Sequence, residues 1–328
     1  MVRQTSIAQT LDIIADRAKY DECAKKLLTY EAVVAWILKS CTKEFSQFSV
    51  KYIMENCIDS RPVISNKSVH QDELDVSGSA NGDKRIDGLN TEANAISEQT
   101  VYYDIRLKAS IPGTPLPVQL IINLEIQSND NPGYPLVTRG LYYCARMISE
   151  QYGTVFTKEE YDKIQKVYSI WICPDPVKKH RNGIFKYRTV EDAVHGTPYT
   201  KPDQYDLMEV VILNLGDAEK ASELEILDLL NTLFSATISP DAKKKKLRDN
   251  FNIAMTEEFE SEVAEMCNLG SALVQMGEQR GEQRGEMNKA KETAFNLKEM
   301  GMSEENIAKA VNVSVALIKR WLGGAMAQ

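Results

Sequence analysis

The sequence predicts an α/β fold, in which a mixed sheet of four or five strands carries helices on both faces and is followed by a helical extension. Residues 100–128 contain two runs of alternating apolar residues around a Pro- and Gly-rich connection, which is typical of a β-hairpin. Residues 167–173 and 207–215 are almost continuously apolar, as expected for central strands buried on both faces. Apolar residues at helical spacing occupy much of the remaining chain.

The N-terminal part of the chain is predicted to be helical. Residues 6–17 and 20–45 carry apolar side chains at helical spacing, and residues 48–58 have the pattern of a further short helix. Residues 59–83 are polar and rich in Ser, Asn and Gly, which predicts a loop. We expect residues 84–90 to form the first strand of the core.

Beyond the hairpin, residues 136–152 have the pattern of a helix that crosses over between strands at 118–128 and 167–173. Residues 174–202 are rich in Pro, Lys, Arg and His, which predicts a long loop. Its basic cluster Lys178–Arg181 either contacts a DNA backbone or is a solvated loop, which is the commoner case.

From Ala218 onward the chain is predicted to be helical and charged. The four lysines at 243–246 either attract phosphate or begin a solvated helix. The repeat GEQRGEQRGEMN at 277–288 places a Gly at every fourth position. Since Gly is unfavourable within helices, we expect a soft hinge there.

Residues 303–322 have the apolar pattern of a helix-turn-helix. Asn312 occupies the turn position, where a left-handed conformation is needed. Lys319 and Arg320 are the only basic residues of the second helix. A DNA-reading unit generally needs a supporting third helix, so a helical hairpin that serves packing or dimerisation remains the alternative.

Composition limits the location and the partners of the protein. The chain has 328 residues and a net charge of −8, so a nucleic-acid partner requires a local basic patch. The sequence has neither an apolar run of about 18 residues nor a secretory signal, and we expect no membrane association. The six cysteines are scattered in mostly apolar contexts, which predicts reduced core residues in a cytoplasmic protein.

The predicted hairpin places two carboxylates together. If its turn is centred near Thr114 and Pro115, Asp104 lies opposite Glu125, with side-chain roots ~5 Å apart. Two carboxylates so close repel each other unless they bind a cation, which indicates an Mg²⁺ or Mn²⁺ site. Gln127 points the same way and can add an amide. Alternatively, Asp104 lies on a solvated face where Arg106 or Lys108 neutralises it.

Asp104 followed by Glu125-Ile126-Gln127 at the end of a hydrophobic strand resembles the PD-(D/E)xK nuclease signature, in the variant form Asp…Glu-x-Gln. The surrounding sequence resembles the PD-(D/E)xK nuclease family transposases, also described as recombination-promoting nucleases, over roughly residues 20–215. The sequence segments that carry this resemblance are GLNTE, VYYDIRL, LIINLEIQ, PGYPLVTRGLYYCARMISEQYG and KVYSIWICPDP. The sequence departs from the pattern twice, because no Pro precedes Asp104 and Gln127 replaces the usual Lys.

The resemblance implies a restriction-endonuclease-like core and metal-dependent cleavage of DNA phosphodiester bonds, linked to recombination or mobile elements. Asp104 and Glu125 are then expected to ligate Mg²⁺ or Mn²⁺, with the carbonyl of Ile126 as a third ligand. Gln127 can orient water but carries no charge, and Lys108, on the Asp104 face, is the candidate for the missing cation. By the same resemblance, Glu92 and Glu31 are candidate auxiliary residues; read alone, they are a loop carboxylate and an exposed helix glutamate.

Arg139, Tyr143 and Arg146 recur at helical spacing and are expected to share one helix face. Guanidinium groups match phosphate oxygens bidentately, so this face is a candidate DNA contact; alternatively, the arginines form surface salt bridges.

The domain organisation follows from these patterns. We expect N-terminal helices packed on the core, a polar loop, a nuclease-like core, a helical extension, and a glycine-repeat hinge with a helix-turn-helix-like tail. Their bounds are 1–58, 59–83, 84–216, 217–276 and 277–328. The alternative function is that of a catalytically weak DNA-binding or assembly protein, and a homo-oligomer is compatible with either function.

Overall fold

The computed structural model describes residues 6–58, 63–64, 92–93, 101–102, 104–112, 118–124, 132–220 and 222–323. The chain divides into two compact units. The larger is Ile14–Gly270, and the smaller combines Met1–Ile13 with Ser271–Gln328.

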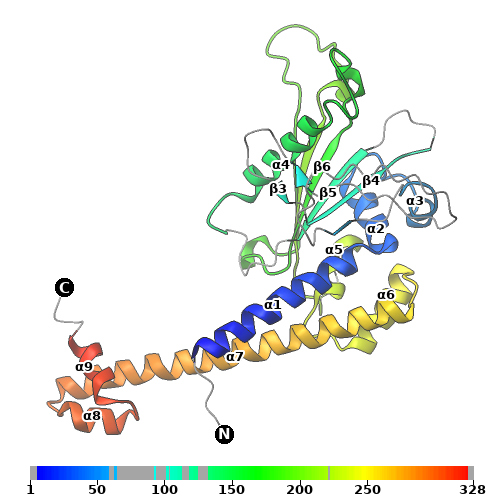
Figure 1. Ribbon diagram of the computed structural model, residues 1–328. Helices are drawn as coiled ribbons and strands as arrows, with labels where there is room; N and C mark the ends of the chain where they lie inside the picture. The colour runs from blue at the N-terminus through cyan, green and yellow to red at the C-terminus, as the bar shows by residue number, and fades with distance from the viewer. Residues whose placement is uncertain are drawn as a thin grey trace, which may run out of the picture. The chain divides into compact units, whose positions relative to one another are not determined.

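The larger unit is built on a six-stranded mixed sheet, with the strand order β1-β4-β5-β6-β8-β7 (Figure 1). Strands β5, β6 and β8 are parallel, whereas β4 and β7 run antiparallel to their neighbours. A separate antiparallel pair joins β2 to β3. The strands are β1 Val63–Ile64, β2 Glu92–Ala93, β3 Val101–Tyr102, β4 Ile105–Ala109, β5 Val118–Leu124, β6 Val167–Cys173, β7 Gly183–Arg188 and β8 Met208–Asn214. The predicted mixed sheet with flanking helices and a helical C-terminal region is confirmed.

Helix α4 (Leu136–Glu150) connects β5 to β6 and covers one face of the sheet, as the crossover prediction requires. It packs into a hydrophobic core whose members are Leu136, Tyr143, Cys144, Met147, Val167, Trp171, Cys173, Val210 and Ile212. The helix approaches the sheet closely at Gly140. A Cβ atom there would lie 2.6 Å from Val210 Cγ1 and 3.0 Å from Trp171 Nε1. Gly140 therefore sets the spacing between α4 and the sheet.

Helices α2 (Glu31–Cys41) and α5 (Glu225–Phe234) lie on the other face of the sheet (Figure 1). Both are apolar and largely buried, as fits helices enclosed by the core. Trp36 Nε1 of α2 donates a hydrogen bond of 3.2 Å to the carbonyl of Phe251, at the end of α6 (Pro240–Phe251). Lys186 Nζ of β7 donates to the carbonyl of Cys41 at 2.6 Å. The short helix α3 (Val50–Asn56) begins at Ser49, whose Oγ accepts from the Tyr52 N–H.

The prediction of a long loop at 174–202 was wrong in part, because this stretch contains β7. The strand extends the sheet beyond β8 as an antiparallel neighbour, and most of its side chains are exposed. Aromatic Phe185 and Tyr187 alternate with basic Lys186 and Arg188, a strand signal that the surrounding Pro and basic residues obscured. The predicted polar loop at 59–83 likewise contains β1. The basic cluster is exposed, and Arg181 pairs with Asp175 at 2.9 Å.

All six cysteines are buried thiols, which confirms their prediction as core residues. Burial raises the pKa of the Cys41 and Cys144 thiols to about 12, so both are protonated at neutral pH. Within the described residues, no helix combines the length and the apolar character needed to cross a membrane.

The lysine run at 243–246 is mainly structural. Lys243 is fully buried, and its Nζ donates to the carbonyls of Leu233 and Ser235 at 3.0 and 2.8 Å, at the C-terminal end of α5. Lys244 and Lys246 form ion pairs with Glu260 and Asp228, respectively. Three of the four lysines thus join α6 to neighbouring elements, and the phosphate-binding interpretation of the run is not supported.

Replacing Lys243 with Met is expected to lower the free energy of unfolding by ~1–3 kcal/mol at pH 7, because two buried carbonyls lose their donor. Lys245→Met, at the exposed member of the run, is the matched control and should change stability by less than ~0.5 kcal/mol. Urea unfolding of both variants measures the difference. An unchanged midpoint for Lys243→Met would contradict the capping role.

The same residue predicts a pH dependence. Burial lowers the pKa of Lys243 in the folded chain. At pH values between this lowered pKa and the unfolded pKa of about 10.4, the unfolded chain therefore binds more protons than the folded chain does. The contribution of Lys243 to stability should therefore rise with pH across that window. Lys243→Met should remove the rise.

The smaller unit contains the C-terminal part of α7 (Glu257–Glu299), followed by α8 (Glu304–Ala310) and α9 (Val315–Gly323). Helix α1 (Ser6–Leu28) begins in this unit. The glycine repeat lies within α7, which is continuous through residues 277–288. Each of its three glycines has open space where a Cβ would stand. The hinge itself remains a prediction, as do the domain bounds.

Replacing Gly277, Gly281 and Gly285 together by Ala should stabilise this part of α7 by up to ~1 kcal/mol per site, because Ala has the higher helix propensity and meets no neighbour. Amide hydrogen exchange across residues 277–288 should slow accordingly. Unchanged exchange in the triple variant would show that the repeat is not the weak part of the helix.

Gly140→Ala is the opposite case and should destabilise the larger unit, since the added Cβ collides with Val210.

Candidate functional site

Asp104 lies directly before β4 and is held by a lysine of the first helix. Lys25 Nζ of α1 is 2.9 Å from Asp104 Oδ1 and 2.7 Å from Asp21 Oδ2, one helical turn earlier. The Lys25 side chain is only 17% exposed, whereas that of Asp104 is 31% exposed. One ammonium group is therefore shared by two carboxylates, both of which solvent can reach.

The pKa shifts in this cluster arise because two carboxylates, Asp21 and Asp104, share the ammonium of Lys25. Burial alone would lower the pKa of Lys25, but the charge of Asp104 and the hydrogen bonds to both carboxylates outweigh it and raise the pKa. Burial raises the pKa of Asp21, and the charge of Asp104 adds to that rise. Lys25 is thus a fixed ammonium at neutral pH, and the carboxylates favour a further cation nearby.

Helix α4 supplies an arginine held by aromatic side chains. Arg139 Nε and Nη2 donate to Tyr143 Oη at 2.9 and 2.7 Å, and Nη1 donates to Tyr134 Oη. The guanidinium carbon lies 5.3 Å from the ring centroid of Trp171, and this side chain itself packs on Tyr143. The prediction that Arg139 and Tyr143 share one helix face is confirmed.

Tyr143 links the arginine to the Asp104 cluster. Burial raises the pKa of Tyr143, the hydrogen bond from Arg139 lowers it, and the charge of Asp104 raises it further. Since a Coulombic effect falls off with distance, Asp104 and Tyr143 lie within electrostatic reach of each other. Asp104 thus combines a direct contact with the Lys25 ammonium and a position within electrostatic reach of the Arg139–Tyr143 pair.

The hairpin register differs from the predicted one. A turn centred near Thr114 and Pro115 would pair Ile105 with Leu124, but the structure pairs Ile105 with Ile122. The predicted direct opposition of Asp104 and Glu125 was therefore wrong by two residues. A two-residue shift leaves each side chain on its predicted face, because side chains alternate with period two. Glu125, Ile126 and Gln127 themselves lie outside the described residues, and their roles remain predictions.

Arg146 lies in the interior instead of at the arginine–tyrosine face. It is 8% exposed, and its charge helps to lower the pKa of Glu150, which burial raises. Glu150 also pairs with Arg106 at 2.8 Å, which joins α4 to β4. This geometry favours a structural role for Arg146, so we do not include it in the proposed DNA contacts. Asp104 pairs with Lys25, a partner that the sequence did not indicate.

Lys108 is four residues along β4 from Asp104, a distance of roughly 13 Å at the rise of a strand. It is therefore a poorer source of positive charge at Asp104 than Lys25 is.

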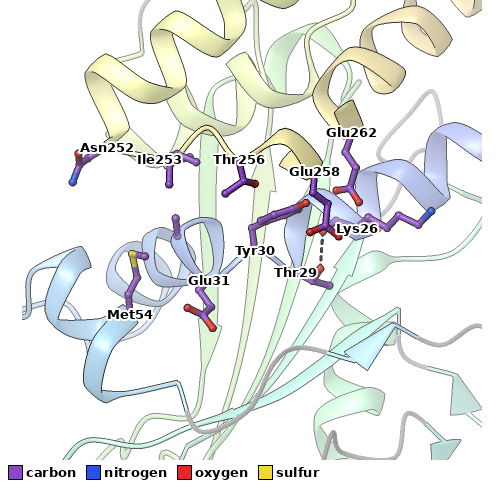
Figure 2. A pocket seen from close by; sticks show the side chains of 12 residues that line it. Lys26, Thr29, Tyr30, Glu31, Met54, Asn252, Ile253, Thr256, Glu258 and Glu262 are labelled. Atoms are coloured by element: carbon purple, nitrogen blue, oxygen red, sulfur yellow. Dashed lines mark hydrogen bonds between the residues drawn. The ribbon is translucent and has the colours of Figure 1, made fainter. Parts of the chain in front are cut away.

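Glu31 begins α2 and lines a pocket of about 560 Å³ with side chains that include Tyr30, Met54, Glu258 and Glu262. Figure 2 shows Glu31 pointing away from Glu258 and Glu262. Asp104 is not among the pocket-lining residues. The acidic residue of the first helix that lies near Asp104 is Asp21, and the auxiliary role predicted for Glu31 is not supported.

The backbone of Glu92 lies in β2, paired with Tyr102 of β3, two residues before Asp104. This register keeps Glu92 as a candidate auxiliary residue.

Carboxylate oxygens are the ligands that Mg²⁺ and Mn²⁺ prefer, so the donor chemistry of Asp104 and its acidic neighbour fits a hard divalent cation. Within the part of the chain that the structure describes, no three His, Cys, Asp or Glu residues converge as a metal site.

A family model described as PD-(D/E)XK nuclease family transposase matches residues 89–293. The chain belongs to this family. The match includes Asp104, Arg139 and Tyr143, and it ends within α7, well beyond residue 215, where the resemblance in the sequence ended. It begins after α1, so Asp21 and Lys25 lie outside it. No curated protein and no solved structure is significantly similar to the chain.

Sequence reasoning missed Asp21, Lys25, Tyr134 and Trp171. Asp21 and Lys25 are four residues apart on a helix, a spacing that predicts their ion pair. Nothing in the sequence indicates that this pair meets a residue 79 positions further on. Tyr134 precedes α4 by two residues, outside the helical spacing that connects Arg139 to Tyr143.

Replacing Lys25 with Met should lower the free energy of unfolding by ~1–2 kcal/mol at pH 7, because two partly buried carboxylates lose their counter-ion. The loss should shrink as the pH falls through the raised pKa of Asp21, because a protonated Asp21 no longer needs a counter-ion. Thermal unfolding at a series of pH values measures it.

Lys26→Met is the matched control. Lys26 forms an exposed ion pair with Glu22, so its loss should cost less than ~0.5 kcal/mol. Equal losses for both variants, or a Lys25→Met loss that persists at pH 3, would contradict the shared-ammonium account.

Proposed function

We propose that the protein is a nuclease that cleaves DNA phosphodiester bonds with a divalent metal ion held at Asp104 and Glu125. Family membership supports a nuclease and mobile-element role. The observation that carries the proposal is the contact of a partly exposed Asp104 with the Lys25 ammonium, within electrostatic reach of the Tyr143 side chain that holds Arg139. Cleavage linked to recombination is the biological setting that we propose.

Asp104 and Glu125 would hold Mg²⁺ or Mn²⁺, with the carbonyl of Ile126 as a third ligand. When bound, such an ion lowers the pKa of a water ligand and neutralises charge on the phosphate. Gln127 would orient water by hydrogen bonding from its side-chain amide.

Lys25 supplies the positive charge that Gln127 lacks. Its raised pKa keeps it an ammonium at neutral pH, so it serves as an electrostatic stabiliser and not as a general base. Its contact with Asp104 places that charge beside the carboxylate nearest to the reaction. In this role Lys25 replaces Lys108, which lies too far along β4.

Arg139 positions the phosphate backbone. Two tyrosine hydroxyls and the Trp171 ring fix its guanidinium, so little side-chain entropy is lost when it binds an anion. Its planar donors match two phosphate oxygens, which an ammonium cannot do. Arg139→Lys is therefore not a conservative change at this site.

Plasmid nicking with Mg²⁺ and with Mn²⁺ tests the proposal. Asp104→Ala and Glu125→Gln should each lower the rate by at least ~100-fold, because each removes a metal ligand. Lys25→Gln should cost ~10–100-fold with Mn²⁺ binding retained, whereas Gln127→Lys should retain or raise the rate. Lys51→Ala, on exposed α3, is the control and should cleave at the parent rate.

Calorimetric titration of Mn²⁺ separates binding from rate, and Glu125→Gln should weaken the binding that it detects. Cleavage by Asp104→Ala at the parent rate would overturn the site. A parent chain that binds DNA but cleaves with neither metal would instead support the alternative, a catalytically weak DNA-binding or assembly protein. If Lys108→Ala nicks plasmid more slowly than Lys25→Gln does, Lys108 and not Lys25 supplies the positive charge at the site.

A further inference from the structure

The C-terminal end of the smaller unit is a small three-helix domain. Helices α8 and α9 pack against the last turns of α7 (Figure 1). They share a buried core that consists of Ala294, Ile307, Ala308, Ile318 and Leu322. The supporting helix that a helix-turn-helix requires is thus the end of α7. This three-helix tail, residues 294–323, begins where the family match ends.

The turn between α8 and α9 has a fixed geometry. Asn312 adopts a left-handed conformation with φ of 54°, as its position in the sequence predicted. The Val313 N–H donates to the Ala308 carbonyl at 3.0 Å, and the Leu317 N–H donates to Ser314 Oγ at 3.3 Å. At the other end of α8, Ser303 Oγ accepts from the Asn306 N–H. A short turn capped at both helices holds α9 at one orientation to α8.

The outward face of α9 carries small and positively charged residues. Its exposed residues are Ala316, Lys319, Arg320 and Gly323. The helix contains no acidic residue. None of the exposed large apolar side chains among the described residues lies on α9, so this face lacks what a stable helix dimer would bury. Small residues let a helix approach a groove closely, and Lys and Arg suit phosphates and the edges of bases.

Charge separates this tail from the rest of the chain. Residues 294–323 contain four Lys and Arg and three Glu, a surplus of one positive charge, while the whole chain carries −8. One of the three glutamates, Glu304, lies 3.5 Å from Lys298 and is neutralised locally. The local surplus supplies the basic patch that a nucleic-acid partner of an acidic protein requires.

We propose that α9 is a DNA-docking helix, which enters the major groove of duplex DNA with Ala316 against the bases and with Lys319 and Arg320 on bases or phosphates. The proposal extends the nuclease function, since DNA is the partner in both, but it needs neither the metal nor Asp104. The three-helix tail then recruits duplex DNA, and the Asp104 site acts on it.

Fluorescence anisotropy of the full-length chain with a 25-base-pair duplex tests the proposal, with EDTA present to prevent cleavage. The double variant Lys319→Gln/Arg320→Gln should weaken binding at least tenfold and should reduce the slope of log K against log salt by about two. The control Lys289→Gln/Lys291→Gln removes the same charge from exposed positions on α7 and should change binding less than threefold. Ala316→Glu, which adds a carboxylate to the exposed face, should also abolish binding.

Circular dichroism must show parent-like helix content for each variant, as expected because none of these residues is buried. Parent-like binding by both α9 variants would overturn the proposal, as would equal losses in the α9 and control variants. A changed oligomeric state in light scattering, with DNA binding intact, would make the tail a protein interface and would also overturn it. If binding depends on α9 but the parent does not cleave, the nuclease proposal fails and the docking proposal stands.

Discussion

The close approach of α4 to the sheet is the constraint on which the candidate site depends. Gly140 leaves no room for a side chain between α4 and Val210, so the helix lies close to β6 and β8. That spacing places Arg139 against the Trp171 ring and Tyr143 near Asp104. About two turns beyond Tyr143, the same helix brings Glu150 to Arg106 of β4. A single packed interface thus orients the functional end of α4 and joins the helix to the strand that follows Asp104.

The positive charge beside Asp104 comes from Lys25, which lies outside the segment that the family model matches. Lys25 of α1 contacts Asp104 while it is also paired with Asp21, so the cluster contains more carboxylates than cations. Such a cluster is suited to recruit a divalent cation, and it keeps Lys25 protonated beside the reacting groups. The replacement of the usual lysine by Gln127 is then compensated by a charge that comes from the N-terminal helix. The family pattern and the added helix are complementary parts of one proposed site.

Local patterns in the sequence predicted much of the fold. The apolar runs of β6 and β8 and the helical spacing of α4 identify a parallel crossover without reference to any relative. The hairpin register failed by two residues, because a Pro-rich connection does not reveal where its turn is centred. Lys243 was also misjudged, since four consecutive lysines indicate a solvated surface, whereas one of them caps α5 from within the core.

The site was less predictable than the fold, because its parts come from distant segments. Asp104 and the Arg139–Tyr143 pair followed from motif and spacing, but Lys25 meets Asp104 only through the packing of α1. Burial likewise decided the role of Arg146, which shares the helical spacing of Arg139 but lies beside Glu150. Spacing identifies which residues share a helix, and tertiary packing decides which of them reach solvent.

The most direct test is the anomalous difference density of crystals grown with Mn²⁺. The account predicts one Mn²⁺ ion at ~2.0–2.3 Å from a carboxylate oxygen of Asp104 and from one of Glu125, on the face of the sheet that α4 covers. A Glu125 side chain on the opposite face, or an Mn²⁺ ion bound elsewhere and not to Asp104, would contradict it.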